Sequence, residues 1–356
     1  MPQHSTTMLV PLDTLSILAI VDNETDPMSP APPCVKATGR LGDIALGKGR
    51  PVGDERGGGV VKEVAMEQLC CGAHGLSLMI TGTCNNIPQT LLFDTGPTDS
   101  IWTANAARLA SPLHNISLVH LSHWHRDHSG GMLSALHAIA SAKASYSSLP
   151  ASIDLVQPPT PTIVDLHPSR PSYRGFTTPL GIVSLEADPT FSEIEDAGGK
   201  VDKNAEAHEV LDSYFLISGE IPRVTPGENG IRAGLRFENG EWVSDELIAD
   251  ERFVVCHVKD KGLVLFTGCS HAGVVNAALH ALTLTSNALP LYAIVGGYHL
   301  ADAEPAHLHS TVQALKALDV KVLIAGHCTG WRAKFEIEKE MPGCLVPSFV
   351  GITTML

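Results

Sequence analysis

The sequence lacks long apolar runs, an excess of basic charge and a regular array of cysteines. Its apolar stretches, such as Ile17–Val21, are far shorter than a membrane-spanning helix, which needs about 20 residues. Residues 1–20 also lack the basic segment, the long apolar segment and the cleavage pattern of a signal peptide. We therefore expect neither a membrane span nor a secretory signal.

Charge and cysteine usage limit the partners and the compartment. The formal net charge is −14 at pH 7, and no basic patch offsets it, which argues against nucleic acid or an anionic membrane as a partner. The eight cysteines are scattered, without the framework of a small secreted domain. We expect a cytoplasmic protein that acts on a small-molecule substrate, with a homodimer as the alternative to a monomer.

The composition is sufficient for one large α/β domain. Hydrophobic residues make up 44% and charged residues 17% of the 356 residues, which is ample for a buried core. Residues 1–59 show little periodicity beyond a short strand expected at Leu15–Val21, and we interpret them as a poorly patterned N-terminal extension. The domain is expected over residues 60–356. A Pro- and Ser-rich insertion at about 143–250 is too long for a bare loop, so we expect it to shape or cover the pocket.

The segment His123–His128 places three imidazoles and a carboxylate within six residues. It follows the apolar run Ile116–Leu121, which is typical of a buried strand, and Ser129–Gly131 permits a turn into a helix near Met132. The cluster is therefore expected on a loop at the end of a strand. Zinc accepts imidazole and carboxylate donors and needs three or four of them, so these four donors can serve two adjacent ions. A polar surface loop is the alternative.

The last hundred residues repeat one arrangement three times: a strand, a glycine turn that bears a histidine, and a helix. The three turns are Gly268-Cys269-Ser270-His271, Gly296-Gly297-Tyr298-His299 and Gly326-His327-Cys328. In α/β proteins, ligands gather at the C-terminal ends of strands. The repetition favours one shared site over chance placement.

Together these motifs resemble those of the metallo-β-lactamase-fold hydrolases, in the same order along the chain. The matching motifs are Phe93–Gly96, His123-x-His125-x-Asp127-His128, Gly268–His271 and Gly326-His327. A narrower resemblance, carried by residues 73–77, 218–223, 267–276, 296–300 and 327–330, is to the group named after a 7,8-dihydropterin-6-methyl-(ribofuranosyl)aminobenzene phosphate synthase. It covers about residues 60–351. The resemblance implies an αββα sandwich, with two mixed β-sheets face to face, helices outside and the metal site at one edge.

The resemblance also implies a role for each matching residue. His123 and His125 would bind a first metal ion. Asp127, His128 and His327 would bind a second one. Asp94 matches the carboxylate that orients the site through hydrogen bonds rather than by ligation. The ions implied are two Zn2+, with Mn2+ or Fe2+ as alternatives.

Two positions depart from the superfamily pattern. Most relatives have a metal-bridging aspartate where this chain has Cys269, whose thiolate is a good zinc ligand and could bind one ion or leave the bridge weaker. No separate His-x-x-Gly-His motif precedes that strand, so the third ligand of the first metal is not given by the pattern. His271 is our first choice because it follows a strand turn. His257, inside the strand-like Phe253–Val258, is the alternative.

Further side chains are candidate substrate contacts. His299 lies in a Gly-Gly turn beside the site, and His74 lies in a glycine-flanked turn before a strand. Structural packing is the alternative for both. Glu220, Arg223 and Glu251 are also candidates, with simple solvation of an exposed charge as the alternative.

The chemistry that follows is hydrolysis. Two metal ions held about 3.5–4 Å apart lower the pKa of a water towards about 7, and the hydroxide formed attacks a carbonyl carbon. Asp127 would orient the nucleophile and relay a proton to the leaving group. A small cyclic amide or ester, a lactam or lactone, is the preferred substrate, since the acidity of the chain disfavours polyanions.

Two alternatives belong to other classes. The first is the synthase of the narrower group, which would join a dihydropterin to a ribofuranosyl-aminobenzene phosphate. It would need a basic pocket, for which Arg223, Arg232 and Arg236 are available in the insertion. The second is a sensor that keeps the fold and binds a ligand without turnover.

Overall fold

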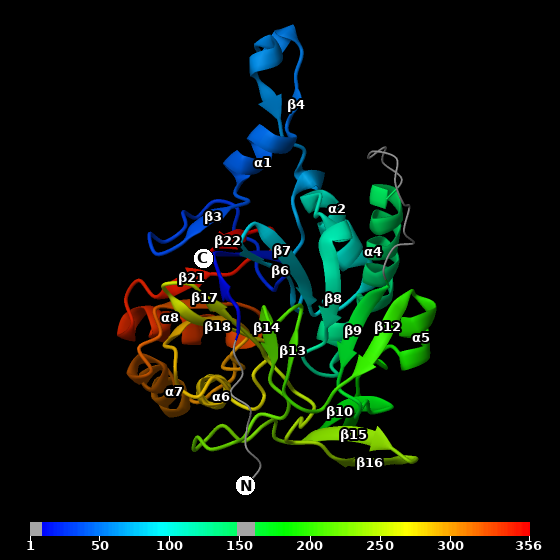
Figure 1. Cartoon of the computed structure of the whole chain (residues 1–356), viewed down its shortest axis with the longest axis vertical. Helices are drawn as coiled ribbons and strands as arrows, with labels where there is room; N and C mark the ends of the chain where they lie inside the picture. Colours follow the sequence, from blue (N-terminus) through cyan, green and yellow to red (C-terminus); the bar gives the residue numbers. More distant parts are fainter. Residues whose placement is uncertain (1–8, 148–160) are drawn as a thin grey trace.

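Two mixed β-sheets packed face to face form the centre of the computed structural model, which describes residues 9–147 and 161–356 (Figure 1). The strands of the first sheet are β2 (Thr14–Val21), β3 (Lys36–Thr38), β6 (Ser77–Cys84), β7 (Ile87–Phe93), β8 (Ile116–His120), β9 (Thr162–Leu166), β12 (Gly199–Lys203) and β22 (Thr353–Met355). They lie in the order β12–β9–β8–β7–β6–β2–β22–β3. Strands β7, β8, β9 and β12 run parallel, and β2, β6 and β7 run antiparallel.

The second sheet carries the C-terminal motifs. Its strands are β1 (Pro11–Leu12), β13 (His208–Val210), β14 (Phe215–Ile217), β17 (Val254–Val258), β18 (Gly262–Thr267), β19 (Leu291–Gly296), β20 (Val322–Ala325) and β21 (Leu345–Pro347). The order is β13–β14–β17–β18–β19–β20–β21, with β1 paired to β17. Strands β18 to β21 are parallel, so the glycine turns after β18, β19 and β20 share one edge.

Both faces of the central strands are buried, which explains their continuous apolar runs. Along β6, Leu78 and Ile80 point into the core between the sheets, whereas Met79 packs on the helix side. Along β18, Val264 faces the other sheet and Leu265 faces the helices. This alternation with a period of two residues fixes the register of each strand.

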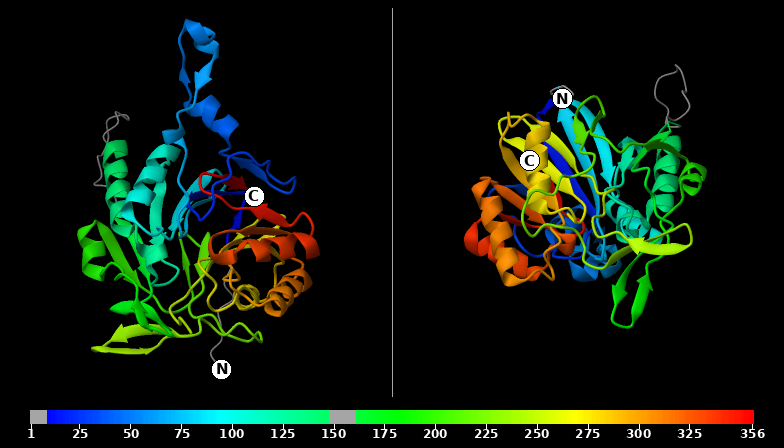
Figure 2. Two further views of the ribbon diagram at one scale, coloured as in Figure 1. Left: turned by 180° about the vertical axis from the view of Figure 1, so that it is seen from behind. Right: turned by 90° about the horizontal axis from the view of Figure 1, so that it is seen from below.

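Helices cover the outer face of each sheet, as the view from behind in Figure 2 shows. The first sheet is covered by α2 (Asp99–Leu109), α4 (Met132–Ser147) and α5 (Phe191–Asp196), and the second by α6 (Val274–Leu284), α7 (Pro305–Ala317) and α8 (Trp331–Glu340). The helix α3 (Arg126–Ser129) is a single turn within the histidine motif. The predicted αββα sandwich is confirmed. No helix among the described residues is long and apolar enough to cross a membrane.

The insertion expected at about 143–250 is only partly separate from the sandwich. Its strands β9 and β12 extend the first sheet, and β13 and β14 extend the second. A separate four-stranded sheet is built from β10 (Tyr173–Thr178), β11 (Gly181–Ser184), β15 (Gly234–Glu238) and β16 (Glu241–Ser244), in the order β11–β10–β15–β16. Residues 148–160 of the insertion lie outside the described residues. The short strands that join the main sheets make long-range pairings, which local sequence patterns do not reveal.

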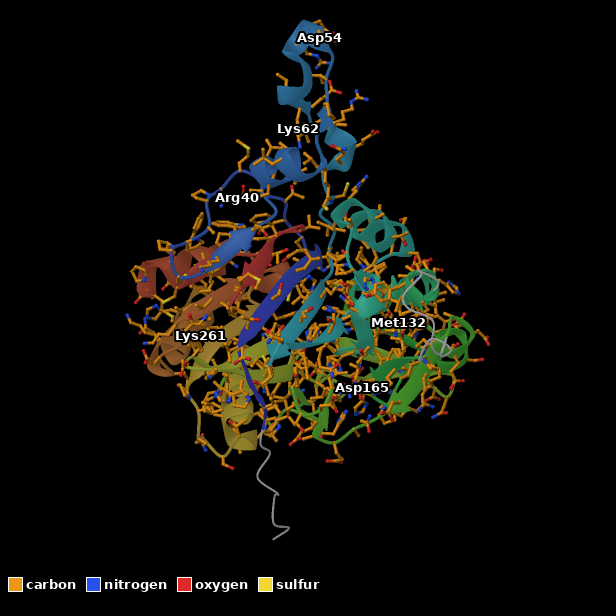
Figure 3. The ribbon with its side chains drawn as sticks, turned by 45° about the horizontal axis from the view of Figure 1, so that its top comes forward. Arg40, Asp54, Lys62, Met132, Asp165 and Lys261 are labelled. Atoms are coloured by element: carbon orange, nitrogen blue, oxygen red, sulfur yellow. The ribbon has the colours of Figure 1, made fainter. Side chains whose placement is uncertain are left out.

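The N-terminal boundary expected at residue 60 also needs correction. Strand β2 lies between β6 and β22 in the first sheet, and its residues Leu15 and Ile17 are buried in the central core. Residues 40–68 do project from the sandwich as an arm, with Asp54 near its far end (Figure 3). The arm contains α1 (Leu41–Lys48), the paired strands β4 (Arg50–Pro51) and β5 (Lys62–Glu63), and short 3-10 turns.

Candidate metal centre

The predicted donor residues meet where strands of both sheets end. Asp94 directly follows β7, and the segment His123–His128 follows β8. Cys269 and His271 follow β18, and His327 follows β20. Both sheets therefore contribute to one edge of the sandwich, which is the place that the pattern of strand ends predicts.

Three imidazoles form one donor group, which we call the histidine group: His123, His125 and His271. The Nε2 atom of His123 lies 2.9 Å from Nδ1 of His125 and 3.1 Å from Nε2 of His271. The third distance, from Nε2 of His271 to Nδ1 of His125, is 3.2 Å. Three nitrogens around one tetrahedral zinc ion, each about 2.0–2.1 Å from it, would lie about 3.3 Å apart.

Four side chains form a second donor group, which we call the cysteine group: Asp127, His128, Cys269 and His327. The Sγ atom of Cys269 lies 3.2 Å from Nε2 of His128 and 3.1 Å from Nε2 of His327. The Oδ2 atom of Asp127 lies 3.5 Å from Nε2 of His128 and 3.4 Å from Nε2 of His327.

Cys269 links the two groups. Its sulfur lies within 4.8 Å of the ring nitrogens of His123 and His271 as well as of the cysteine group. The thiol therefore occupies a position between the two groups, where most relatives were expected to have a bridging carboxylate. Burial raises the pKa of the Cys269 thiol, so a cation would displace a proton from this sulfur.

Hydrogen bonds behind the rings of His128 and His123 set their tautomers. Asp94 accepts from the Ser122 backbone N–H at 2.7 Å, from Ser122 Oγ–H at 2.8 Å and from Nδ1–H of His128 at 2.6 Å. Because Ser122 Oγ donates to Asp94, it accepts from Nδ1–H of His123, 2.9 Å away. Nε2 of His123 is therefore a bare lone pair, and Nε2 of His128 becomes one when its imidazole is neutral; both atoms face the donor groups.

His327 is oriented by the N-terminal segment. Its Nδ1–H donates to Oδ1 of Asn23 at 3.0 Å, and the same oxygen accepts from the Gly75 backbone N–H at 3.1 Å. Its backbone N–H donates to Oδ1 of Asp22 at 2.8 Å. Sequence reasoning missed Asp22 and Asn23, although both follow directly on a strand end, as the other site residues do.

Several site residues adopt the left-handed backbone conformation that non-glycine residues rarely take. The φ angles are +57° at Asp94, +63° at Ser270, +49° at His299 and +46° at His327. Such residues are held in place by surrounding structure and cluster at functional sites. Here, the hydrogen bonds to the Asp94 side chain and to the His327 backbone hold two of them.

The pKa values differ between the two groups. Burial, together with neighbouring imidazoles, lowers the pKa of His123 and His271 well below the ordinary range, and burial with Arg174 lowers that of His125 to about 3. In the cysteine group, burial is outweighed by Asp127 and Asp94, which raise the pKa of His128 well above its ordinary value. The histidine group is therefore neutral in the metal-free protein.

His327 also carries a proton at neutral pH. Burial opposes the charged form, but the Cys328 sulfur and the Asp127 carboxylate raise the pKa of His327 to about 9. The pKa of Asp127 lies well below its usual value despite burial, because His128 and His327 stabilise the carboxylate. A cation entering the cysteine group would replace these protons.

The donor set fits metal ions. In the histidine group, each of the three ring nitrogens faces the other two. No placement of protons turns all three contacts into hydrogen bonds, because one pair is always left as two lone pairs or two N–H groups. Imidazole and thiolate donors suit zinc or iron better than magnesium or calcium. His257, the alternative third ligand, lies within β17 and is not part of either donor group among the described residues.

The candidate substrate contacts divide into two sets. His299 packs its ring 4.5 Å from the ring of His271, and Nε2 of His74 lies 3.5 Å from Oδ2 of Asp127. These two lie beside the donor groups. Arg223 instead donates to the carbonyls of Ile221 and Leu247 and lies 4.0 Å from Glu220. Within the described residues, neither Glu220 nor Arg223 bonds to a donor side chain.

Two carboxylates, Glu251 and Asp250, hold the loops of the site through backbone N–H groups. Both oxygens of Glu251 accept backbone N–H groups, from His271 and Ala272, at 2.7 Å each. Glu251 therefore orients the turn of His271 rather than contacting a substrate. Asp250 accepts from the Trp124 backbone N–H at 2.8 Å and pairs with buried Arg174. Nothing local in the sequence pairs Asp250 with the His123–His128 segment, so this partner could not be predicted.

A cavity of about 250 Å³ opens beside the histidine group. His125 lies on one side of it, and residues of β10 and β15 and the neighbouring loops form the rest of its wall. The separate four-stranded sheet therefore shapes a pocket next to the donor groups, the role expected for the insertion.

Comparison with known proteins places these features in context. No family model matches the sequence. The 7,8-dihydropterin-6-methyl-4-(β-D-ribofuranosyl)-aminobenzene-5′-phosphate synthase of Methanocaldococcus jannaschii is 30% identical over 265 residues, which are 73% of this chain and 82% of that protein. An uncharacterized protein of the same organism is 29% identical over 123 residues, which are 35% of this chain and 43% of that protein.

The fold of this chain is similar to that of a solved structure over nearly the whole length of both chains. The crystal structure of a metal-dependent hydrolase of the β-lactamase superfamily matches with a TM-score of 0.64 at 21% sequence identity, and the match covers 95% of this chain and 98% of that chain. This likeness bears on the fold alone.

Proposed function

Because the chain belongs to the family of the 7,8-dihydropterin-6-methyl-4-(β-D-ribofuranosyl)-aminobenzene-5′-phosphate synthase-like proteins, which have the metallo-β-lactamase fold, we propose that it is a hydrolase with two zinc ions. Its substrate would be a small carbonyl compound, and a lactam or lactone is the preferred class. The observation that carries the proposal is the pair of donor groups that meet at Cys269.

The residues of each group have defined tasks in this proposal. The histidine group would hold the first ion and the cysteine group the second, with Cys269 between them. When bound, the ions would supply a water of lowered pKa and an electrophilic centre for the carbonyl oxygen of the substrate. Asp94 and Asn23 keep Nδ1 of His128 and His327 protonated, so that their Nε2 lone pairs face inward.

Asp127 and His74 form a path for the proton. Nδ2–H of Asn23 donates to Nδ1 of His74 at 3.1 Å, so the other ring nitrogen, Nε2, carries the hydrogen that faces Asp127. Asp127 would orient the attacking water, and the imidazole of His74 connects its carboxylate to solvent because 69% of the His74 side chain is exposed. A proton taken up at Oδ2 of Asp127 can thus leave the site or pass to the leaving group.

The first experiment combines metal analysis with a substrate panel. We expect about two zinc ions per chain and chelator-sensitive ring-opening of at least one lactam or lactone. His271→Ala should lower kcat/KM by more than about 100-fold. Substitutions of residues that only hydrogen-bond to metal ligands typically cost about 10- to 100-fold. The matched control is His257→Ala, which removes a half-buried histidine outside the donor groups and should leave turnover near wild type.

Other outcomes would contradict the proposal. Turnover that survives metal removal would exclude the metal-dependent mechanism, and equal losses in the two histidine variants would remove His271 from the ligand set. Ligand binding without turnover of any panel compound would instead favour the non-enzymatic sensor.

A second candidate is the synthase activity of the curated relative, favoured by the 30% identity over 73% of the chain. Such a substrate carries a phosphate, for which three of the arginines in the insertion are candidates: Arg223, Arg232 and Arg236. Arg223 is bonded to backbone carbonyls and Arg236 to Glu238 and Ser169, which leaves Arg232. Incubation with 4-(β-D-ribofuranosyl)aminobenzene 5′-phosphate and a dihydropterin that carries a diphosphate leaving group on its 6-methyl carbon, followed by mass spectrometry, tests it directly, because the joined product must form together with free diphosphate. Formation of the joined product without lactam or lactone hydrolysis would favour the synthase.

A further inference from the structure

The cavity beside His125 has a mostly apolar wall. Its volume of about 250 Å³ lies below the roughly 300–1,000 Å³ of pockets that take drug-sized ligands, so it suits a single ring system. Apart from His125, Thr177 and Arg232, the side chains of the wall are apolar: Phe176, Leu185, Ile231, Leu235 and Ile248. A ligand placed here would have one end beside the histidine group and much of its remaining surface against apolar side chains.

One charge in this wall has no partner within the part of the chain that the structure describes. Among the described residues, Arg232 has no hydrogen bond or ion pair, and its side chain is exposed. The nearby arginines differ. Arg174 is buried against Asp245 and Asp250, and Arg236 pairs with Glu238. Arg232, which lies in the loop before β15, is therefore available to a ligand.

We propose that this cavity is a substrate subsite for an apolar ring that bears a single carboxylate, with the carboxylate bound by Arg232 and the reacting carbonyl on the His125 side. The inference rests on the proposed function, because it takes the donor groups as the place of reaction. A guanidinium presents paired N–H groups that match the two oxygens of a carboxylate. A single arginine in a protein of net charge −14 favours one negative charge over a dianionic phosphate.

The test measures binding without turnover. The probes are 4-isopropylbenzoate and 4-isopropylbenzamide, which share one apolar ring and differ in charge, titrated calorimetrically into the zinc-loaded full-length protein. Wild type should bind the benzoate at least about tenfold more tightly than the benzamide. Arg232→Gln should abolish this preference, and the matched control Arg236→Gln should keep it. Phe176→Ala should weaken the binding of both probes.

Each part of the inference has a result that overturns it. Equal binding of the two probes by wild type, or an unchanged preference in Arg232→Gln, would remove Arg232 from the subsite. Unchanged binding of both probes to Phe176→Ala would place the ring elsewhere.

The subsite and the proposed function can fail separately. If the preference depends on Arg232 but no lactam or lactone is opened, the subsite stands and the hydrolase proposal fails. If lactams are opened but Arg232→Gln treats carboxylated and neutral lactams as wild type does, the subsite is overturned and the hydrolase proposal stands.

Discussion

Replacing Asp94 by asparagine should weaken zinc binding at the cysteine group, because Asp94 orients the ring of His128. Asp94 is fully buried, and its carboxylate accepts hydrogen bonds from the Ser122 backbone, from the Ser122 hydroxyl and from His128. The asparagine amide keeps one acceptor oxygen and places N–H groups where Oδ2 accepted. Two donors then face each other at Nδ1 of His128.

The size of the effect follows from this conflict. Either His128 loses a hydrogen bond to a charged group, worth about 1.5–3 kcal/mol, or its proton moves to Nε2, the atom that faces the cysteine group. Since 1.4 kcal/mol corresponds to a factor of about ten, zinc affinity at the cysteine group should fall about 10- to 100-fold. At other metal sites, substitution of a residue that hydrogen-bonds to a ligand lowers metal affinity by about the same factor.

The assay is a zinc titration in competition with a chromophoric chelator, with circular dichroism to show that the variant is folded. Ser122→Ala is the matched control, because it removes the hydroxyl that accepts from His123 but leaves the bond between Asp94 and His128. In the control, zinc affinity should fall at the histidine group and stay unchanged at the cysteine group. If Asp94→Asn binds both zinc ions within about twofold of wild type, the account of how the tautomers are set is wrong.

Three further predictions concern single side chains. Burial raises the pKa of Asp188 from 3.8 to about 6, so the folded protein binds a proton that the unfolded chain has released, and stability falls as pH rises through this window. Asp188→Asn should therefore raise the free energy of unfolding in urea, by up to about 3 kcal/mol at pH 8 and by less at pH 5; a gain independent of pH would contradict this. Asp165→Asn leaves buried Arg252 without its carboxylate, which lies 2.7 Å away, and should cost about 3–5 kcal/mol in the same assay; a loss under about 1 kcal/mol would be inconsistent with a buried ion pair. Cys269→Ser should remove the near-ultraviolet sulfur-to-metal absorption of the cobalt-loaded protein, whereas the control Cys328→Ser should retain it; a band that persists in Cys269→Ser would show that its sulfur is not a ligand.

Local sequence patterns predict the strands and glycine turns that position most of the donor residues. The strands before His123, His271 and His327 were readable because a strand buried on both faces needs an uninterrupted apolar run, and a glycine turn marks its end. The choice of His271 over His257 followed from the same rule, since a histidine after a strand end can reach a shared edge. A histidine within a strand cannot.

Contacts between distant segments could not be predicted in this way. Asn23 orients His327 across 304 positions of sequence, and Glu251 holds the turn of His271 through backbone groups that have no residue signature. The sequence also does not show which arginines of the insertion are bonded within the protein. Whether a guanidinium is bonded, as in Arg223 and Arg236, or available, as in Arg232, depends on acceptors that only the fold brings near.

The contacts of Asp22, at the end of β2, with the C-terminal part of the chain bear on when the metal centre can form during synthesis. Asp22 accepts hydrogen bonds from the backbone of His327 and from the hydroxyl of Ser348, which are 305 and 326 positions away. The cysteine group can therefore close only after the chain as far as Ser348 has left the ribosome. Its metal can be loaded only once these contacts have formed, and pairings of such long range form slowly.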